Sequence, residues 1–332
     1  MHYLRPTDDA SATVSALREW LASDRPVPLL IETSGSSGTP KRVVLSRAAV
    51  LASARASIRR LGEPGPWALV LPSSYVAGVQ VLVRSLLGGH QPILAGWGDA
   101  AYTSLVPTQL HRMLASAADV AALSSLRAVL LGGGPIDPVL RDRAADAGVR
   151  VVATYGASET AGGCVYDGHP LDGVAVALSE GGRIRITGPV LFDQYDGDPE
   201  LTAATLVDGW FLTSDAGRFD EDGRLRVYGR LDDVVISGGV NVPLPAVAAR
   251  LSAHPSVVAV EVLGVPDPEW GQRVVAFVVA SPPPSVAELR DHVGEVHPRS
   301  WAPRQVMVLD AMPLLANGKL DRVALQTLAA NP

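Results

Sequence analysis

The chain has 332 residues, a formal net charge of −6 and a hydrophobic share of 47%. This composition excludes a disordered chain and, because no basic block is present to neutralise a phosphate backbone, a general nucleic-acid binder. The length suits one large domain and one smaller one. Cys164 is the only cysteine, so no internal disulfide can form, which is typical of a reducing cytoplasm.

The N-terminus and the apolar runs contain no targeting or membrane signal. Residues 1–6 lack the apolar core of a signal peptide, and no apolar run approaches the ~18 residues that a membrane span needs. The sequence therefore predicts a soluble, cytoplasmic protein with no membrane span. It leaves open whether the protein is a monomer or a homodimer.

A loop rich in glycine and hydroxyl residues follows the first predicted helix and strand. An apolar face of helical period predicts a helix over residues 10–21, with Asp8 and Asp9 as caps. A strand over residues 29–31 leads into the loop, which consists of Thr33, Ser34, Gly35, Ser36, Ser37, Gly38, Thr39, Pro40 and Lys41. Its hydroxyls, unobstructed backbone N–H groups and single cation are typical of a phosphate-binding loop.

This loop is not a Walker A motif, because Lys41 follows proline rather than glycine and no Ser or Thr comes after it. Residues 42–45 have the pattern of a strand, so the loop is predicted to join two strands and to bind an anion without a helix dipole. A flexible surface turn is the alternative that this stretch alone leaves open.

The next predicted elements are a helix that Ser46 caps and Gly62 ends, a strand over residues 67–71 and a helix through residues 79–86. Arg84 lies on this otherwise apolar helix. Its spacing alone favours an arginine whose stem crosses apolar surface while its charge stays at a solvated edge.

Two apolar strands in the middle of the chain each end in residues suited to ligand binding. The strand over residues 126–131 runs into glycines, of which Gly133 and Gly134 would let a ligand approach the backbone, although a tight turn explains them equally well. The strand over residues 150–153 precedes the segment Tyr155, Gly156, Ala157, Ser158, Glu159 and Thr160. An isolated tyrosine or glutamate is usually structural, so this segment alone carries no function.

The last third of the chain places further candidates on loops. A hairpin is predicted at Asp222-Gly223, and strands are predicted over residues 257–265 and 273–280. The candidate residues are Asp215, Arg230, Asp232, Ser237, Gly238, Gly239 and Lys319. A turn aspartate and a solvated C-terminal lysine are the ordinary interpretations of Asp215 and Lys319.

Three segments, in this order, resemble the acyl-adenylate-forming superfamily of acyl-CoA synthetases, adenylation domains and luciferases: Thr33 to Lys41, Tyr155 to Thr160, and Asn317 to Arg322. The resemblance implies an α/β fold, with a large N-terminal domain over residues 1–230 that is shortened at its N-terminus. It also implies a small mobile α+β domain over residues 231–332, which carries the catalytic lysine.

The resemblance assigns ATP, Mg²⁺ and CoA to the chain, and a role to each candidate. Lys319 would promote adenylate formation and Glu159 would bind Mg²⁺. Tyr155 would stack on the adenine, which the loop with Gly133 and Gly134 would flank, and Gly156 and Ser158 would also belong to the nucleotide-binding site. Asp215 would accept the ribose hydroxyls and Arg230 would reach the ribose or a phosphate. Asp232 would be the hinge, and the Ser237, Gly238 and Gly239 loop would cover the CoA channel.

Within the superfamily, the short N-terminal part and the stretch from Tyr75 to Arg84 are similar to the o-succinylbenzoate:CoA ligases of menaquinone biosynthesis, in their compact actinobacterial form. This similarity implies an aromatic dicarboxylic acid as substrate. Arg84 would then bind the second carboxylate of that acid and would not lie at a solvated edge. Tyr75 stands where relatives commonly have histidine.

Two other functions stay open. One is a ligase, or an adenylation enzyme that loads a carrier protein, for another aryl or short acyl acid. The other is a non-catalytic nucleotide-binding module, which is disfavoured because Lys41, Glu159, Asp215 and Lys319 are all present.

Overall fold

The structure is a computed structural model that describes residues 2–33, 40–179, 182–315 and 320–330, apart from the side chains of residues 228, 232 and 241. The chain divides into two compact units. Unit 1 consists of Met1–Glu180, Ile184–Thr213 and Phe219–Arg226, and unit 2 of Gly181–Arg183, Ser214–Arg218 and Val227–Pro332.

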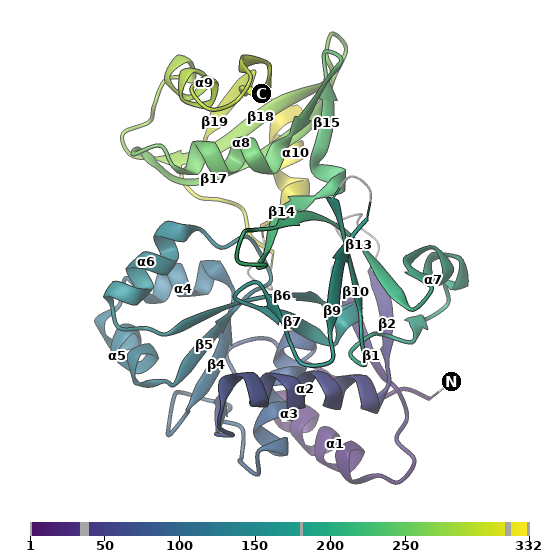
Figure 1. Ribbon diagram of the computed structural model, residues 1–332. Helices are drawn as coiled ribbons and strands as arrows, with labels where there is room; N and C mark the ends of the chain where they lie inside the picture. The colour runs from purple at the N-terminus through teal and green to yellow at the C-terminus, as the bar shows by residue number, and fades with distance from the viewer. Residues whose placement is uncertain (1, 34–39, 180–181, 316–319, 331–332) are drawn as a thin grey trace. The chain divides into compact units, whose positions relative to one another are not determined.

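Helices and strands are interspersed from α1 to β6, and strands predominate from β7 to β14 (Figure 1). In chain order they are α1 Ala10–Ala22, β1 Leu29–Thr33, β2 Lys41–Leu45, α2 Arg47–Leu61, β3 Trp67–Ala68, α3 Val76–Leu87, β4 Tyr102–Leu105, α4 Pro107–Met113, α5 Ala117–Ser125, β5 Ala128–Leu131, α6 Pro138–Asp146, β6 Val151–Ala157, the 3₁₀ turn η1 Ser158–Thr160, β7 Gly162–Tyr166, β8 His169–Pro170, β9 Ala175–Leu178, β10 Arg183–Thr187, β11 Gln194–Tyr195, α7 Pro199–Thr205, β12 Leu206–Val207, β13 Trp210–Phe219 and β14 Leu225–Arg230.

A six-stranded sheet of order β3-β4-β5-β6-β7-β8 forms the centre of the described part of unit 1. Strands β3 to β6 are parallel, while β7 and β8 return antiparallel. Both faces of β5 are buried: Ala128 and Leu130 pack in the cluster with residues of α2 and α3, and Val129 and Leu131 pack in the cluster with residues of α4, α5 and α6. This two-sided burial explains the continuous apolar run of β5.

Two smaller sheets complete the described part of unit 1. The sheet β1-β2-β11 packs against α1, α2 and α3, and its core includes Leu17, Ile31, Val43 and Phe192. The second has the order β12-β13-β10-β9, with β14 paired to β13. The first of these sheets places the predicted phosphate loop, because that loop joins β1 to β2.

Unit 2 is a sheet covered on both faces by helices. Its elements are η3 Leu231–Asp233, β15 Val234–Ser237, β16 Val240–Pro243, α8 Leu244–Ser252, β17 Val257–Asp267, β18 Gly271–Ala280, α9 Val286–Gly294, η4 Arg299–Trp301, β19 Gln305–Val308 and α10 Arg322–Ala330. The sheet order is β16-β15-β18-β17, with β19 parallel to β18. Leu251 and Leu289 of α8 and α9 pack on one face, and Leu325 of α10 packs on the other with Phe277.

Most predicted helix ends are confirmed. The side chains of Asp9 and Ser46 accept hydrogen bonds from the backbone N–H groups of the first turns of α1 and α2, and Gly62 ends α2 with a φ of 99°. Asp8 does not cap α1 as predicted, because its carboxylate instead accepts a hydrogen bond from Ser74 Oγ at 2.5 Å.

Two predicted strands have different lengths in the structure. The strand predicted over residues 67–71 pairs with β4 only at Trp67 and Ala68, after which Leu69 N donates to Ile93 O. The strand predicted over residues 150–153 continues to Ala157, because β7 folds back beside it and supplies antiparallel partners. Tyr155 is therefore part of a strand. Within the described residues, none of the helices is both long and apolar enough to span a bilayer.

Candidate active site

The predicted phosphate loop lies at the end of the β1–β2 hairpin. Thr33 and Lys41 form its last strand pair, and the Thr33 hydroxyl donates to the Lys41 carbonyl at 3.4 Å. The prediction that the loop joins two strands is confirmed. Residues 34–39, which carry the predicted roles of Ser34, Gly35, Ser36, Ser37, Gly38 and Thr39, lie outside the described residues.

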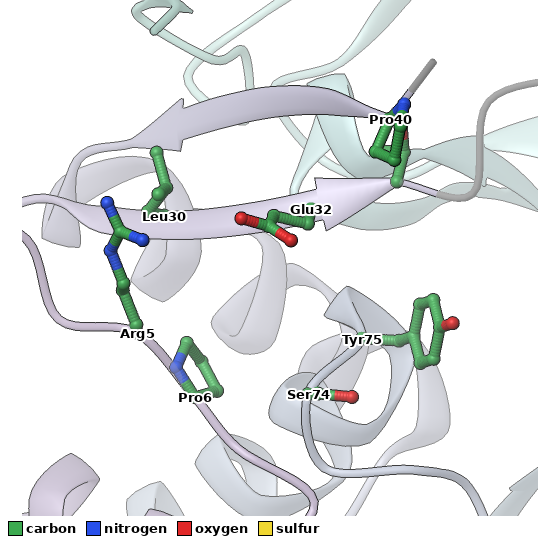
Figure 2. Close-up of a pocket in the computed structure, with 8 residues that line it drawn as sticks. Arg5, Pro6, Leu30, Glu32, Pro40, Ser74 and Tyr75 are labelled. Carbon is green, nitrogen blue, oxygen red and sulfur yellow. The ribbon is translucent and has the colours of Figure 1, made fainter. Parts of the chain in front are cut away.

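Two hollows flank the base of this hairpin. A cavity of about 400 Å³ is lined by Arg5, Pro6, Leu30, Glu32, Thr33, Pro40, Ser74 and Tyr75 (Figure 2). A smaller cavity of about 230 Å³ is lined by Pro40, Lys41, Arg42, Tyr195, Asp196, Asp198 and Leu201. Both sides of the hairpin base therefore leave room for a ligand, and Tyr75 faces the larger hollow.

The N-terminal segment forms one wall of the larger cavity through Arg5 and Pro6, a role that no sequence pattern predicts. Leu4 pairs with Leu29 at the edge of β1. The next residues reach the turn before α3, where Ser73 Oγ donates to Thr7 O at 2.5 Å. These contacts tie the sheet edge to the start of α3, and Arg5 and Pro6 between them line the cavity.

The glycines after β5 lie beside the strand that carries Tyr155. A Cβ at Gly132 would be 2.3 Å from Thr154 Oγ1, and Gly133 has a φ of +80°. Gly132 therefore leaves room for Thr154, and Gly133 adopts a left-handed backbone conformation that favours glycine. A Cβ at Gly134 would have no neighbouring atom within 4 Å, so there is room for a ligand beside this residue.

Glu159 follows β6 in the turn η1, and its side chain is only 8% exposed. Tyr195 Oη donates to Glu159 Oε1 at 2.7 Å, and Phe192 N donates to the Glu159 carbonyl at 2.9 Å. Gly156 permits this turn, because a Cβ there would lie 2.3 Å from the Gly162 carbonyl oxygen.

The surroundings of Glu159 fit a divalent cation. No ion pair neutralises its carboxylate among the described residues, and a buried anion without a counter-charge is costly. The described residues also contain no cluster of three metal-binding side chains, so phosphate oxygens would have to supply most of the other ligands. The predicted metal role of Glu159 stays a prediction.

Tyr195 joins the hairpin to Glu159 and was not among the predicted site residues. Its ring lies 5.4 Å from Lys41 Nζ, while its hydroxyl binds Glu159. Burial and the adjacent Glu159 carboxylate raise the pKa of Tyr195. The base of the predicted phosphate loop, at Lys41, and Glu159 of the Tyr155–Thr160 segment therefore both contact Tyr195.

Arg84 is buried in unit 1 and does not lie at a solvated edge. The residue is 3% exposed, its guanidinium lies 5.0 Å from the Trp67 ring centroid, and its Nε has no hydrogen-bond partner in the described chain. Burial lowers the pKa of this guanidinium. The solvated-edge interpretation is wrong, and the binding of a substrate carboxylate by Arg84 stays a prediction.

Other predicted residues belong to unit 2. Asp215 lies in β13 and Arg230 ends β14, and each already has an interaction partner. Asp232 lies in η3. Ser237 ends β15 with its hydroxyl buried and without a partner among the described residues. The roles predicted for these residues stay predictions.

The base of the loop that carries Lys319 is anchored within unit 2, although residues 316–319 themselves lie outside the described residues. Leu314 pairs with Leu320 across it. Arg322 forms ion pairs with Asp233 at 2.8 Å and with Glu261 at 2.7 Å. Burial raises the pKa of Glu261, an effect that Arg322 partly offsets. The start of α10 is thus tied to the residue next to the predicted hinge.

Comparison with known proteins identifies the class. Residues 8–199 match the family described as AMP-binding enzyme, and residues 246–319 match the AMP-binding enzyme C-terminal domain. The chain belongs to the AMP-binding enzyme family. It is 42% identical to the probable 2-succinylbenzoate–CoA ligase of Mycobacterium tuberculosis (strain ATCC 25618 / H37Rv), over 96% of this chain and 89% of that protein.

Solved structures agree with this assignment. The o-succinylbenzoate CoA synthetase of Bacillus subtilis, in complex with its acyl-adenylate intermediate, has a TM-score of 0.77 at 29% identity, over 90% of this chain and 68% of that chain. The same enzyme has also been solved with ATP and a magnesium ion. The amide bond synthetase McbA of Marinactinospora thermotolerans has a TM-score of 0.83 at 29% identity, over 92% and 70% of the two chains.

These findings confirm the resemblance to the adenylate-forming superfamily and its α/β fold, with a large N-terminal AMP-binding domain and a C-terminal domain. The domain boundary at residue 230 and the roles of single residues stay predictions.

Proposed function

We propose that this chain is an AMP-forming ligase that joins o-succinylbenzoate to CoA, a reaction of menaquinone biosynthesis. Family membership and the relative from Mycobacterium tuberculosis support the reaction class. The observation that carries the choice of acid is Arg84, a buried guanidinium for which the described residues provide no carboxylate.

A buried guanidinium that has no carboxylate partner destabilises the fold until a ligand supplies one. Moving a charged group from water into a protein interior costs several kcal/mol of desolvation free energy. Only a well-placed partner of opposite charge offsets a cost of that size. An acid with a second carboxylate supplies that partner, and arginine can bind it through two parallel hydrogen bonds.

The reaction starts with an attack of the acid carboxylate on the α-phosphorus of ATP. A carboxylate oxygen–phosphorus bond forms, the bond to the bridging oxygen breaks, and pyrophosphate leaves with that electron pair. The step brings two anions together, so catalysis consists of positioning and charge stabilisation. The hairpin backbone, Lys41 and Lys319 would carry this charge, and Mg²⁺ held by Glu159 would add positive charge beside the phosphates.

In the second step the CoA thiolate attacks the acyl carbon and AMP leaves. Lys319 would have to withdraw before the thiol can approach, and a rotation of the small domain about Asp232 would achieve this. The same rotation would bring the Ser237–Gly239 loop to the thiol channel. The tie between Arg322 and Asp233 supports this proposal, because it joins the start of α10 to the segment beside the predicted hinge.

Replacing Gly238 by alanine is expected to slow thioester formation about tenfold and to leave adenylate formation unchanged. Gly238 has a φ of +58°, and a Cβ there would lie 2.6 Å from the Trp270 ring, so the loop must shift. Strain of this kind costs about 1–3 kcal/mol. The two half-reactions are measured separately, by pyrophosphate exchange and by CoA consumption from supplied acyl adenylate. An equal slowing of both would contradict a CoA-side role.

A pyrophosphate-exchange assay with a panel of acids tests the proposed function. We expect exchange with o-succinylbenzoate, and much weaker exchange with 3-benzoylpropionate, which lacks the ring carboxylate. Preference for another acid would favour the alternative ligase or carrier-loading enzyme. ATP binding without exchange for any acid would favour a nucleotide-binding module.

A further inference from the structure

Tyr195 combines three contacts that separate it from an ordinary core tyrosine. It lies on β11 beside β2, opposite Val43, and only 3% of its surface is exposed. Its backbone N–H donates to Thr202 Oγ1 at 3.0 Å, and its ring packs on Phe192 at a centroid distance of 4.8 Å. The tyrosine is therefore held in one orientation by its surroundings.

The hydroxyl of Tyr195 fixes the direction of the Glu159 carboxylate. It donates to Oε1 at 2.7 Å, while the nearby Phe192 N–H holds the Glu159 carbonyl at 2.9 Å. Side chain and backbone of Glu159 are thus both tied to the same short segment. With Oε1 occupied by the phenol, the second carboxylate oxygen is the one left to face a cation.

The ring of Tyr195 contacts Lys41, while its hydroxyl binds Glu159. Lys41 Nζ lies 5.4 Å from the ring centroid, within the range of a cation–π contact. Among the described residues no ion pair joins Lys41 to Glu159. A direct pair would neutralise both groups, whereas the intervening ring leaves the ammonium for a phosphate and the carboxylate for a metal ion.

We propose that Tyr195 is a positioning residue that aims Glu159 at the divalent cation and holds Lys41 apart from it. The inference rests on the proposed function, because it needs a cation bound with ATP. Residues that orient a metal ligand through a hydrogen bond change metal affinity about 10- to 100-fold when they are removed.

The test measures ATP binding by calorimetry, with saturating Mg²⁺ and with EDTA. In Tyr195→Phe the ring stays and only the hydroxyl is lost, so the gain in ATP affinity on adding Mg²⁺ should fall about tenfold, while affinity in EDTA stays unchanged. In Tyr195→Leu the ring is lost too, so affinity in EDTA should also fall. Tyr166→Phe is the matched control, because it removes a buried hydroxyl that contacts Ser57 Oγ at 2.7 Å.

Each outcome decides between distinct conclusions. Equal Mg²⁺ dependence in Tyr195→Phe, Tyr166→Phe and the wild type would overturn the positioning role and leave the proposed function intact. A wild-type chain that gains no ATP affinity from Mg²⁺ would overturn the positioning role together with the metal role of Glu159, whereas the proposed ligase function fails only if pyrophosphate exchange with o-succinylbenzoate is absent. A loss confined to Tyr195→Phe supports the proposal.

Discussion

Replacing Lys319 by alanine is expected to lower the rate of adenylate formation at least about 100-fold, the size of effect seen when one charge-stabilising donor is removed from a transition state. Lys41 and Lys319 are the only lysines of the chain, so no third lysine can take over. Transfer of the acyl group from supplied acyl adenylate to CoA should be largely spared, since Lys319 acts before that step. The two rates are measured as pyrophosphate exchange and as AMP release from the adenylate.

The control for Lys319→Ala is Arg299→Ala, which removes an exposed cation of unit 2 that is paired with Asp291 at 2.8 Å. This variant should keep both rates, because exposed ion pairs contribute little. If Lys319→Ala slowed both half-reactions equally, the division of labour between them would be refuted.

Replacing Arg84 by methionine is expected to raise the KM for o-succinylbenzoate by about 30-fold or more, which corresponds to losing about 2 kcal/mol of a charge-assisted contact. The KM for ATP should not change. The free protein should become more stable by about 1 kcal/mol or more, because an unpaired buried charge is replaced by an apolar side chain of similar length. Substrate titrations and thermal unfolding without substrate measure these effects.

Two controls distinguish the loss of a substrate contact from the general effect of removing an arginine. Arg127→Met removes an exposed arginine that pairs with Glu63 at 2.9 Å, and it should leave both KM and stability nearly unchanged. With 3-benzoylpropionate, the wild type and Arg84→Met should be equally poor, since no ring carboxylate is present. An unchanged KM for o-succinylbenzoate in Arg84→Met would show that Arg84 serves the fold alone.

Local patterns predicted much of the fold because the features involved are local. The caps at Asp9 and Ser46, the end of α2 at Gly62 and the strand–loop–strand form of the phosphate loop depend on neighbouring residues. The three motif segments identified the family for the same reason. Strand ends were less predictable, since the extension of β6 to Ala157 depends on pairing with β7.

The parts of the site that escaped prediction depend on contacts between distant residues. Tyr195 and Glu159 are 36 positions apart, and no motif signals that one hydroxyl holds the other carboxylate. The spacing of Arg84 is compatible with an edge or with the interior, and only the packing over Trp67 decides for the interior. Nor does any pattern show that Thr7 accepts a hydrogen bond from Ser73 and thereby ties the N-terminal segment to the start of α3.

The most direct measurement is a product analysis by mass spectrometry after incubation of the chain with o-succinylbenzoate, ATP, Mg²⁺ and CoA. We predict o-succinylbenzoyl-CoA and AMP in equal amounts, and no AMP when the acid is omitted. Formation of ADP in place of AMP, or AMP without any CoA thioester, would contradict the account.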